Sequence, residues 1–167
     1  MRLFVALALE AEARAVLHRW AAEAVAGDEA LRAVPRDSLH VTLAFLGERP
    51  AGEVAEIVRA LAHLPPSPPS LAIAGSAWLP DRGRPTVLVA EIEPDPALAA
   101  LRAAAVERMR PFHEPDERPF RPHVTLARVR RGRRPHGAPP PLPPLRVATA
   151  GMALYRSHPG SRYERLA

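Results

Sequence analysis

The sequence predicts an α+β fold built mainly from antiparallel strands, and three features of its apolar pattern support this prediction. Strand-like segments and amphipathic helical segments are interleaved along the 167 residues. The strand-like segments 70–79 and 86–92 are separated only by a turn-forming stretch, so we expect them to pair as a hairpin. Two further strands end the chain with no helix between them. This order disfavours a doubly wound parallel sheet.

The first half of the chain follows a strand, helix, strand order. A first strand is expected over about 2–9, and a helix over about 10–26, where apolar residues recur three and four positions apart until Gly27. The next strand is expected over about 39–46 and ends at Gly47.

The remaining chain contains two more helices and a proline-rich segment. A helix over about 52–64 runs into a proline-rich connector, and another over about 96–110 begins at Pro94, Asp95 and Pro96, residue types favoured at a helix entrance. The stretch 130–144 is rich in proline and arginine and is expected to be an exposed, stiff loop. The last strands are expected at about 120–129, 145–155 and 163–166.

Composition and length indicate one globular domain covering residues 1–167. Apolar residues make up 47% of the chain without a run near 18 residues, so no membrane span is expected. The N-terminal apolar run is short and reaches the acidic Glu10 directly, unlike a signal peptide. The chain has no cysteine, and its 7 histidines show no compact metal-ligand spacing. We therefore expect no metal or cofactor. By default we expect the protein in the cytoplasm and as a monomer.

One five-residue word, His-Val-Thr-Leu-Ala, occurs twice, beginning at His40 and at His123. A second copy of a given word should arise by chance on the order of a few times in ten thousand, so we interpret the pair as an internal repeat. Side chains alternate faces along a strand, so each copy presents its histidine and threonine on one face and its valine and leucine on the other. The spacing of 83 residues is half the chain. Two similar lobes facing each other would bring both imidazoles to one groove.

Two imidazoles and two hydroxyls in one groove are suited to acid–base chemistry on a phosphate. One neutral imidazole can accept a proton while a charged partner donates one, because the pKa of histidine lies near neutrality. The hydroxyls of Thr42 and Thr125 can hold non-bridging phosphate oxygens. A single histidine on a strand is more often structural, but packing has no need for the same polar pair twice.

All 23 basic residues are arginine, and the formal net charge is +5. Arginine is the side chain best suited to bidentate phosphate contacts. Arg128 lies beside the second repeat, and four more arginines follow it, at positions 130, 131, 133 and 134. These four have two interpretations: a solvated loop, or a surface that contacts an RNA backbone.

Two blocks of the sequence resemble the two-histidine (2H) phosphoesterases, and within them the bacterial and archaeal RNA 2′,3′-cyclic phosphodiesterases, also called 2′-5′ RNA ligases. The blocks are Val34–Glu48 and Phe120–Arg128, and the chain's opening residues and Leu154–Tyr163 resemble the family as well. The resemblance implies a bilobal fold with two mostly antiparallel sheets, outer helices, pseudo-twofold symmetry and a central groove.

The resemblance also implies metal-free hydrolysis of RNA 2′,3′-cyclic phosphates to 2′-phosphates, with a reversible 2′-5′ ligase activity. By analogy, His40 would protonate the leaving 3′ oxygen and His123 would activate water. The phosphate would be held by the two threonines of the repeats and by Arg128. Strict alternation places Arg128 on the face opposite His123, so this role requires a bulge or a strand end.

Other residues of the same blocks are candidates for the walls of the groove, namely Phe45 and Tyr155. One position departs from the family: relatives often carry an arginine and a tryptophan on the middle strand, where this chain has Thr86 and Val89.

Two alternatives of different kind stay open. The first is a 2H enzyme acting on another cyclic phosphate, such as a nucleotide or an ADP-ribose derivative. The second is a non-catalytic RNA-binding module that keeps the groove. The two complete His-x-Thr motifs count against the second, because binding alone does not require paired proton-transfer groups.

Overall fold

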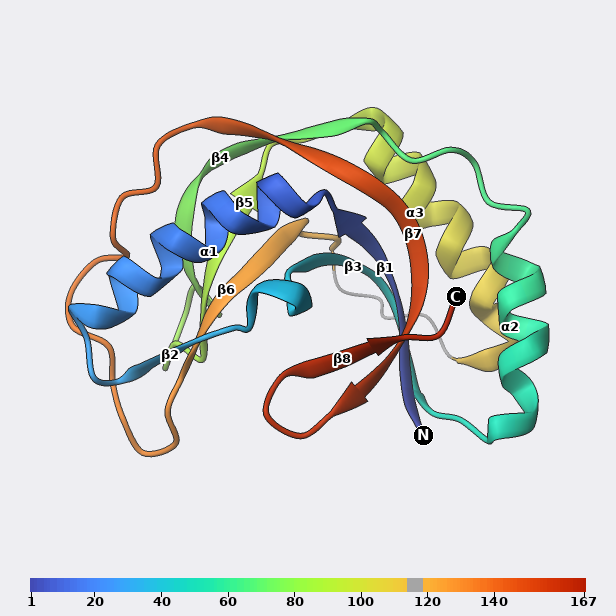
Figure 1. Cartoon of the computed structure of the whole chain (residues 1–167), viewed down its shortest axis with the longest axis horizontal. Helices are drawn as coiled ribbons and strands as arrows, with labels where there is room; N and C mark the ends of the chain where they lie inside the picture. The colour runs from blue at the N-terminus through green and yellow to red at the C-terminus, as the bar shows by residue number, and fades with distance from the viewer. Residues whose placement is uncertain (114–118) are drawn as a thin grey trace.

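The computed structural model describes residues 1–113 and 119–167, and within them the predicted α+β class is confirmed (Figure 1). Eight strands in these residues form one continuous sheet in which all strand pairs are antiparallel. No helix in the described ranges is both long and apolar enough to cross a membrane.

The two halves of the fold repeat one strand, helix, strand unit. The first unit consists of β1 (Arg2–Leu9), α1 (Ala11–Ala26) and β3 (His40–Glu48). The second consists of β5 (Val87–Ile92), α3 (Pro96–Met109) and β6 (His123–Val129). The 83-residue offset between the two histidines also relates the last residues of β1 and β5, Leu9 and Ile92, and those of α1 and α3. The internal repeat predicted from five residues therefore extends over a whole structural unit.

The two expected lobes are halves of one sheet rather than separate sheets. β1 pairs with β3 in one half and β5 pairs with β6 in the other. The repeat strands β3 and β6 meet at the pair Val41 and Val124. At the far side, the long β7 (Leu145–His158) pairs first with β4 (Ser70–Leu79) and then with β1 and β8 (Arg162–Arg165). The 14 residues of β7 are long enough to continue from one half into the other.

The helices interlock the two units. α1 belongs to the first unit but contacts β6 of the second, together with the short β2 (Leu31–Ala33). α3 belongs to the second unit but contacts β3 of the first, and α2 (Val54–Leu61) packs beside it (Figure 1). Each repeat strand is thus supported from behind by the helix of the opposite unit.

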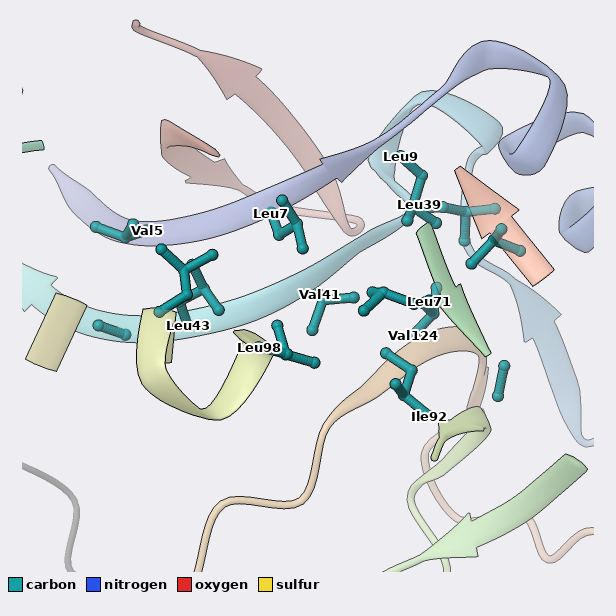
Figure 2. Packing of buried hydrophobic residues seen from close by; sticks show 14 of the residues in the cluster. Val5, Leu7, Leu9, Leu39, Val41, Leu43, Leu71, Ile92, Leu98 and Val124 are labelled. Atoms are coloured by element: carbon teal, nitrogen blue, oxygen red, sulfur yellow. The ribbon is translucent and has the colours of Figure 1, made fainter. Parts of the chain in front are cut away.

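The core lies behind the repeat strands. Figure 2 shows Val41 and Leu43 of β3 packed among Val5 and Leu7 of β1 and Leu98 of α3. Burying each such side chain stabilises the fold by about 1.5–3 kcal/mol. Because side chains alternate along a strand, this packing turns the histidine and threonine of the motif to the other face.

Both repeat strands carry a bulge at the same leucine of the motif. In the β1–β3 pair the register skips Leu43, between Ala44 and Thr42. In the β5–β6 pair it skips Leu126, between Ala127 and Thr125. One extra residue reverses the alternation beyond that point, so the fifth residue after each histidine returns to the histidine's face.

Most expected elements are present, with shifted ends. The hairpin of β4 and β5 is confirmed, and α3 begins as expected, with the Asp95 carboxylate accepting a hydrogen bond from the amide of Leu98 at 2.8 Å. The second helix is shorter than the expected 52–64, because a 3₁₀ turn over Ala51–Glu53 precedes α2. β2 was not expected: its three residues are too few to show a pattern, and it exists because it pairs with β6.

Two neighbouring residues of α1 test the packing of this helix. Leu17 is fully buried, whereas Val16 is 42% exposed. We expect Leu17→Ala to lower the free energy of unfolding by about 2–5 kcal/mol, because it removes buried surface and leaves a cavity. Val16→Ala should change it by less than about 0.5 kcal/mol. Urea unfolding followed by circular dichroism measures both, and equal losses would contradict the placement of α1.

Candidate active site

A groove of about 350 Å³ lies where the two repeat strands meet. It is lined by both histidines, both threonines and Arg128, that is, by all five residues expected to act on a phosphate. The motif on β3 supplies His40 and Thr42, and the motif on β6 supplies His123 and Thr125. The repeat therefore places two equivalent polar pairs on the walls of one groove.

Each imidazole is held by the main-chain carbonyl two residues before it. His40 Nδ1 lies 2.7 Å from the carbonyl oxygen of Ser38, and His123 Nδ1 lies 2.8 Å from that of Arg121. A carbonyl oxygen can only accept a hydrogen bond, so Nδ1 must carry a proton in both rings. Each neutral ring then has an unprotonated Nε2. His40 Nε2 lies 3.1 Å from the Thr42 hydroxyl, which can donate to it.

Aromatic rings enclose His40. The ring centroid of Phe4 lies 4.9 Å from that of His40, and the ring of Tyr163 meets it edge-on at 5.0 Å. Tyr155 stacks behind at 6.0 Å. Burial lowers the pKa of His40 from 6.5 to about 4 against the opposing effect of the Ser38 carbonyl, and the positive charges of His123 and Arg128 lower it further.

His123 has a different electrostatic environment. Burial also lowers its pKa, and the Arg121 guanidinium acts in the same direction, but the Arg121 carbonyl and the carboxylate of Glu91 raise it. Glu91 lies opposite His123 in the β5–β6 register. A nearby carboxylate thus raises the pKa of His123, whereas both charges that act on His40 are positive and lower its pKa.

Arg121 connects β5 and the turn after β4 to the segment before His123. Its Nε donates to Glu91 at 3.1 Å, and its terminal nitrogens form ion pairs with Glu91 and Asp81. These carboxylates hold the pKa of Arg121 above its usual value. The main-chain carbonyl of Arg121 accepts the hydrogen bond from His123 Nδ1. The ion pairs of the Arg121 side chain therefore help to hold that carbonyl in position.

Arg128 reaches the groove because of the bulge at Leu126. Its Nε donates to the Ser161 hydroxyl at 2.8 Å, and Nη2 donates to the Tyr163 hydroxyl at 3.3 Å. Both partners are neutral, and in the described part of the chain Arg128 forms no ion pair with a carboxylate. Two of its five N–H groups are occupied, so the others can donate to an anion.

Ser161 holds Arg128 from a strained turn. It lies between β7 and β8 with φ of 60°, in the left-handed region that residues with a side chain rarely adopt. The preceding Gly160 also has a positive φ, of 81°. This turn brings Ser161 and Tyr163 over the groove, where both line it.

The structure places the two expected wall residues differently. Phe45 is 64% exposed and lines the groove, at the position equivalent to Arg128 after the bulge. Tyr155 does not line it: the side chain is 9% exposed and packs in a buried cluster with Phe4, behind His40. The orientation of β7 turns Tyr155 inward, and Tyr163 of β8 takes the place at the groove.

Thr86 and Val89, the positions where relatives often carry an arginine and a tryptophan, do not line the groove. Val89 is fully buried, and the Thr86 hydroxyl donates to the carbonyl of Leu79. Sequence reasoning missed Ser38 and Ser161 as supports. A main-chain carbonyl carries no side-chain signal, and the contact between Ser161 and Arg128 depends on the arrangement of β6 and β8 in space.

A family model described as the 2′-5′ RNA ligase superfamily matches residues 8–160. An RNA 2′,3′-cyclic phosphodiesterase of Thermus thermophilus is 37% identical over 166 residues, which cover 94% of this chain and 82% of the relative. One of Geobacillus stearothermophilus is 33% identical over 79% of this chain. That match spans only 43% of the relative's own length.

Solved structures show the same fold. The crystal structure of TT0787 of Thermus thermophilus superposes with a TM-score of 0.84 at 30% identity, covering 100% of this chain and 96% of the other. The crystal structure of E. coli LigT complexed with 3′-AMP superposes with a TM-score of 0.69 at 27% identity, covering 99% of this chain and 95% of the other.

The low pKa of His40 predicts a loss of stability in acid. Above pH 6.5 the ring is neutral in both the folded and the unfolded chain and has no effect. As the pH falls from 6.5 towards 4, the unfolded chain takes up a proton that the folded one does not. We expect the free energy of unfolding to fall by about 3 kcal/mol from this group alone.

The measurement is urea unfolding of the protein and of His40→Asn at several pH values in this range. Asn cannot titrate but can still donate to the Ser38 carbonyl. Between pH 6.5 and 4 the free energy of unfolding of the variant should therefore fall by about 3 kcal/mol less than that of the unaltered protein. Parallel curves for the two proteins would show that the pKa of His40 is not lowered in the folded protein.

Proposed function

The chain belongs to the 2′-5′ RNA ligase superfamily, and on this premise we propose that it hydrolyses RNA 2′,3′-cyclic phosphates to 2′-phosphates with His40 and His123 as its proton-transfer groups. The relatives named RNA 2′,3′-cyclic phosphodiesterase support the activity. The structure of E. coli LigT complexed with 3′-AMP supports a nucleotide as the kind of ligand. We propose a monomeric, single-domain enzyme that needs no metal.

One observation carries the assignment of the two histidines. Both Nδ1 atoms are held by carbonyls at the same position relative to the motif, and both rings line one groove. The two Nε2 atoms are therefore the proton-transfer atoms. Neither hydrogen bond has to break when Nε2 gains or loses a proton, so the rings keep their orientation through the reaction.

The reaction is an in-line displacement at phosphorus. The neutral Nε2 of His123 accepts a proton from water while the water oxygen bonds to phosphorus. The bond from phosphorus to the 3′ oxygen breaks, and the protonated Nε2 of His40 gives its proton to that oxygen. The products are a 2′-phosphate and a 3′-hydroxyl. If a 5′-hydroxyl replaces the water, the same steps form a 2′-5′ linkage.

The remaining groove residues stabilise the charge that develops on phosphorus. Thr42 and Thr125 can donate their hydroxyl protons to the non-bridging oxygens, and Arg128 has unused N–H groups beside them. The exposed ring of Phe45 offers an apolar surface to the nucleoside at the rim of the groove.

The mechanism needs a protonated His40, and substrate binding must favour this protonated form. With a pKa of about 4, His40 is neutral in the free protein at neutral pH and cannot act as an acid. An anionic cyclic phosphate beside the ring favours its charged form and raises the pKa. The proton on His40 is therefore taken up with the substrate.

The first prediction concerns the two histidines. His40→Ala and His123→Ala should each lower kcat by roughly a hundred- to ten-thousand-fold, because each ring moves a proton in the transition state. The double variant should be little slower than the slower single one. The exposed His63 provides a control, and His63→Ala should leave the rate unchanged.

The assay follows a short RNA ending in a 2′,3′-cyclic phosphate, with and without EDTA, and identifies the phosphomonoester by chromatography. A 2′-phosphate formed at an EDTA-independent rate is the expected product. Near-normal turnover in either single variant would exclude the paired-histidine mechanism.

The second prediction concerns the pH profile. In the free protein the pKa of both histidines lies below 6.5, so kcat/KM should decline above about pH 6.5 as the imidazolium is lost. The profile of kcat reports the complex, in which the phosphate raises both pKa values, so its limbs should lie at higher pH. Initial rates from about pH 4 to 9 measure both profiles. Identical profiles for kcat and kcat/KM would contradict uptake of the proton with the substrate.

A further inference from the structure

Six exposed arginines gather at one end of the sheet, outside the groove. We call them the arginine surface; they are Arg82, Arg84, Arg130, Arg131, Arg133 and Arg134. The first two lie in the turn between β4 and β5, and the other four follow β6. The two segments are in contact, because Arg84 Nη2 donates to the carbonyl of Arg133 at 2.6 Å. The arginine surface is thus formed by two parts of the chain that are distant in sequence.

The segment that carries four of these arginines is held in place by the rest of the fold. The amide of His136 donates to the Asp28 carboxylate at 2.7 Å, and Trp78 Nε1 donates to the carbonyl of Gly137 at 3.2 Å. Trp20 Nε1 donates to the carbonyl of Pro141 at 3.2 Å, and Leu142 is buried. Both tryptophans of the chain therefore anchor this segment. A pre-ordered segment loses less conformational entropy when it binds a partner.

The arginine surface is not neutralised by the protein itself. Within residues 1–113 and 119–167, none of its six guanidinium groups forms an ion pair with a carboxylate. Arg121 shows the contrast: it lies nearby in sequence but is paired with Asp81 and Glu91. Asp81 lies close enough to Arg82 to interact with it electrostatically, but its ion pair is with Arg121. The surface therefore presents an excess of positive charge to solvent, which attracts a polyanion.

The arginine surface continues from the end of the groove that holds Arg128. Arg130 follows Arg128 by two residues, or about 7 Å along an extended chain. The turn between β4 and β5 is joined to the end of β6, because the amide of Val129 donates to the carbonyl of Thr86 at 2.9 Å. A strand whose terminal phosphate lies beside Arg128 is therefore within a short distance of the arginine surface.

We propose that the arginine surface binds the sugar–phosphate backbone of RNA on the 5′ side of the reacting nucleotide. This inference rests on the proposed function, because a 2′,3′-cyclic phosphate is the 3′ end of a strand and leaves only the 5′ side to contact the protein. Backbone contacts of this kind position a strand without reading its sequence. The enzyme then prefers an oligonucleotide end over a cyclic mononucleotide.

The test compares two doubly neutralised proteins of equal net charge. Arg131→Gln with Arg134→Gln alters the arginine surface at side chains for which the structure shows no hydrogen bond in the described residues. Arg59→Gln with Arg108→Gln is the control, because these exposed arginines lie on α2 and α3, away from the segment 130–144 (Figure 1). Fluorescence anisotropy measures binding of an RNA of about ten nucleotides ending in a 2′-phosphate at several salt concentrations.

The surface variant should bind more weakly, and its log–log salt dependence should be shallower by about 1.4, since each phosphate contact of a single strand contributes about 0.7. The control should keep the slope of the unaltered protein. Hydrolysis of a cyclic mononucleotide should change by less than about twofold in both variants, because it has no upstream backbone to contact.

An unchanged slope in the surface variant would overturn the proposal and leave these arginines as a solvated face. An equal loss in the control would overturn it as well, by showing a response to net charge alone. If the unaltered protein binds RNA through these arginines but hydrolyses no cyclic phosphate, the proposed function fails while the surface stands. If the unaltered protein hydrolyses the mononucleotide but the surface variant keeps the same salt dependence, the proposed function stands while the proposal for the arginine surface fails.

Discussion

The hydrogen bond from each histidine Nδ1 to the carbonyl two residues before it is the interaction on which the site depends. It sets the tautomer, fixes the ring and leaves Nε2 as the reacting atom in His40 and in His123. The carbonyls belong to Ser38 and Arg121, which lie two residues before the first residues of the two repeat strands. The rest of the fold holds these strands in position: β1 and β5 pair beside them, and α3 and α1 pack behind them. The same Nδ1 contact in both halves follows from one repeated strand, helix, strand unit.

The symmetry of the backbone does not extend to the charges. His40 lies among Phe4, Tyr155 and Tyr163, and the charges that act on it are positive. His123 lies opposite Glu91 and beside the ion-paired Arg121. In the free protein this asymmetry favours a proton on His123 over one on His40. The proposed reaction uses the opposite arrangement, so the bound phosphate has to stabilise the charged form of His40. The bulges add a second asymmetry, because the position they bring to the groove is Phe45 in one half and Arg128 in the other.

The sequence predicted the elements and the polar centre of the site because both depend on local patterns. Apolar spacing located α1 and α3, and the repeated His-x-Thr located the groove residues. Strict alternation places Arg128 on the face opposite His123, so the need for a bulge or a strand end could be predicted from the sequence. The position of the bulge, at Leu126, could not. Contacts between distant segments could not be predicted. Tyr155 was placed at the groove from its neighbours in sequence, whereas the packing against Phe4 turns it inward.

The central claim is that both imidazoles are Nδ1-protonated with Nε2 free in the groove, and ¹⁵N NMR of histidine-labelled protein tests it most directly. At neutral pH the account predicts that His40 and His123 show a protonated Nδ1 and an unprotonated Nε2, assigned by comparison with His40→Asn and with a matching variant of His123. Adding inorganic phosphate should shift the Nε2 signals towards the protonated form, because an anion in the groove raises the pKa of a neighbouring imidazole. A proton on Nε2 and none on Nδ1 in either free ring would contradict the account.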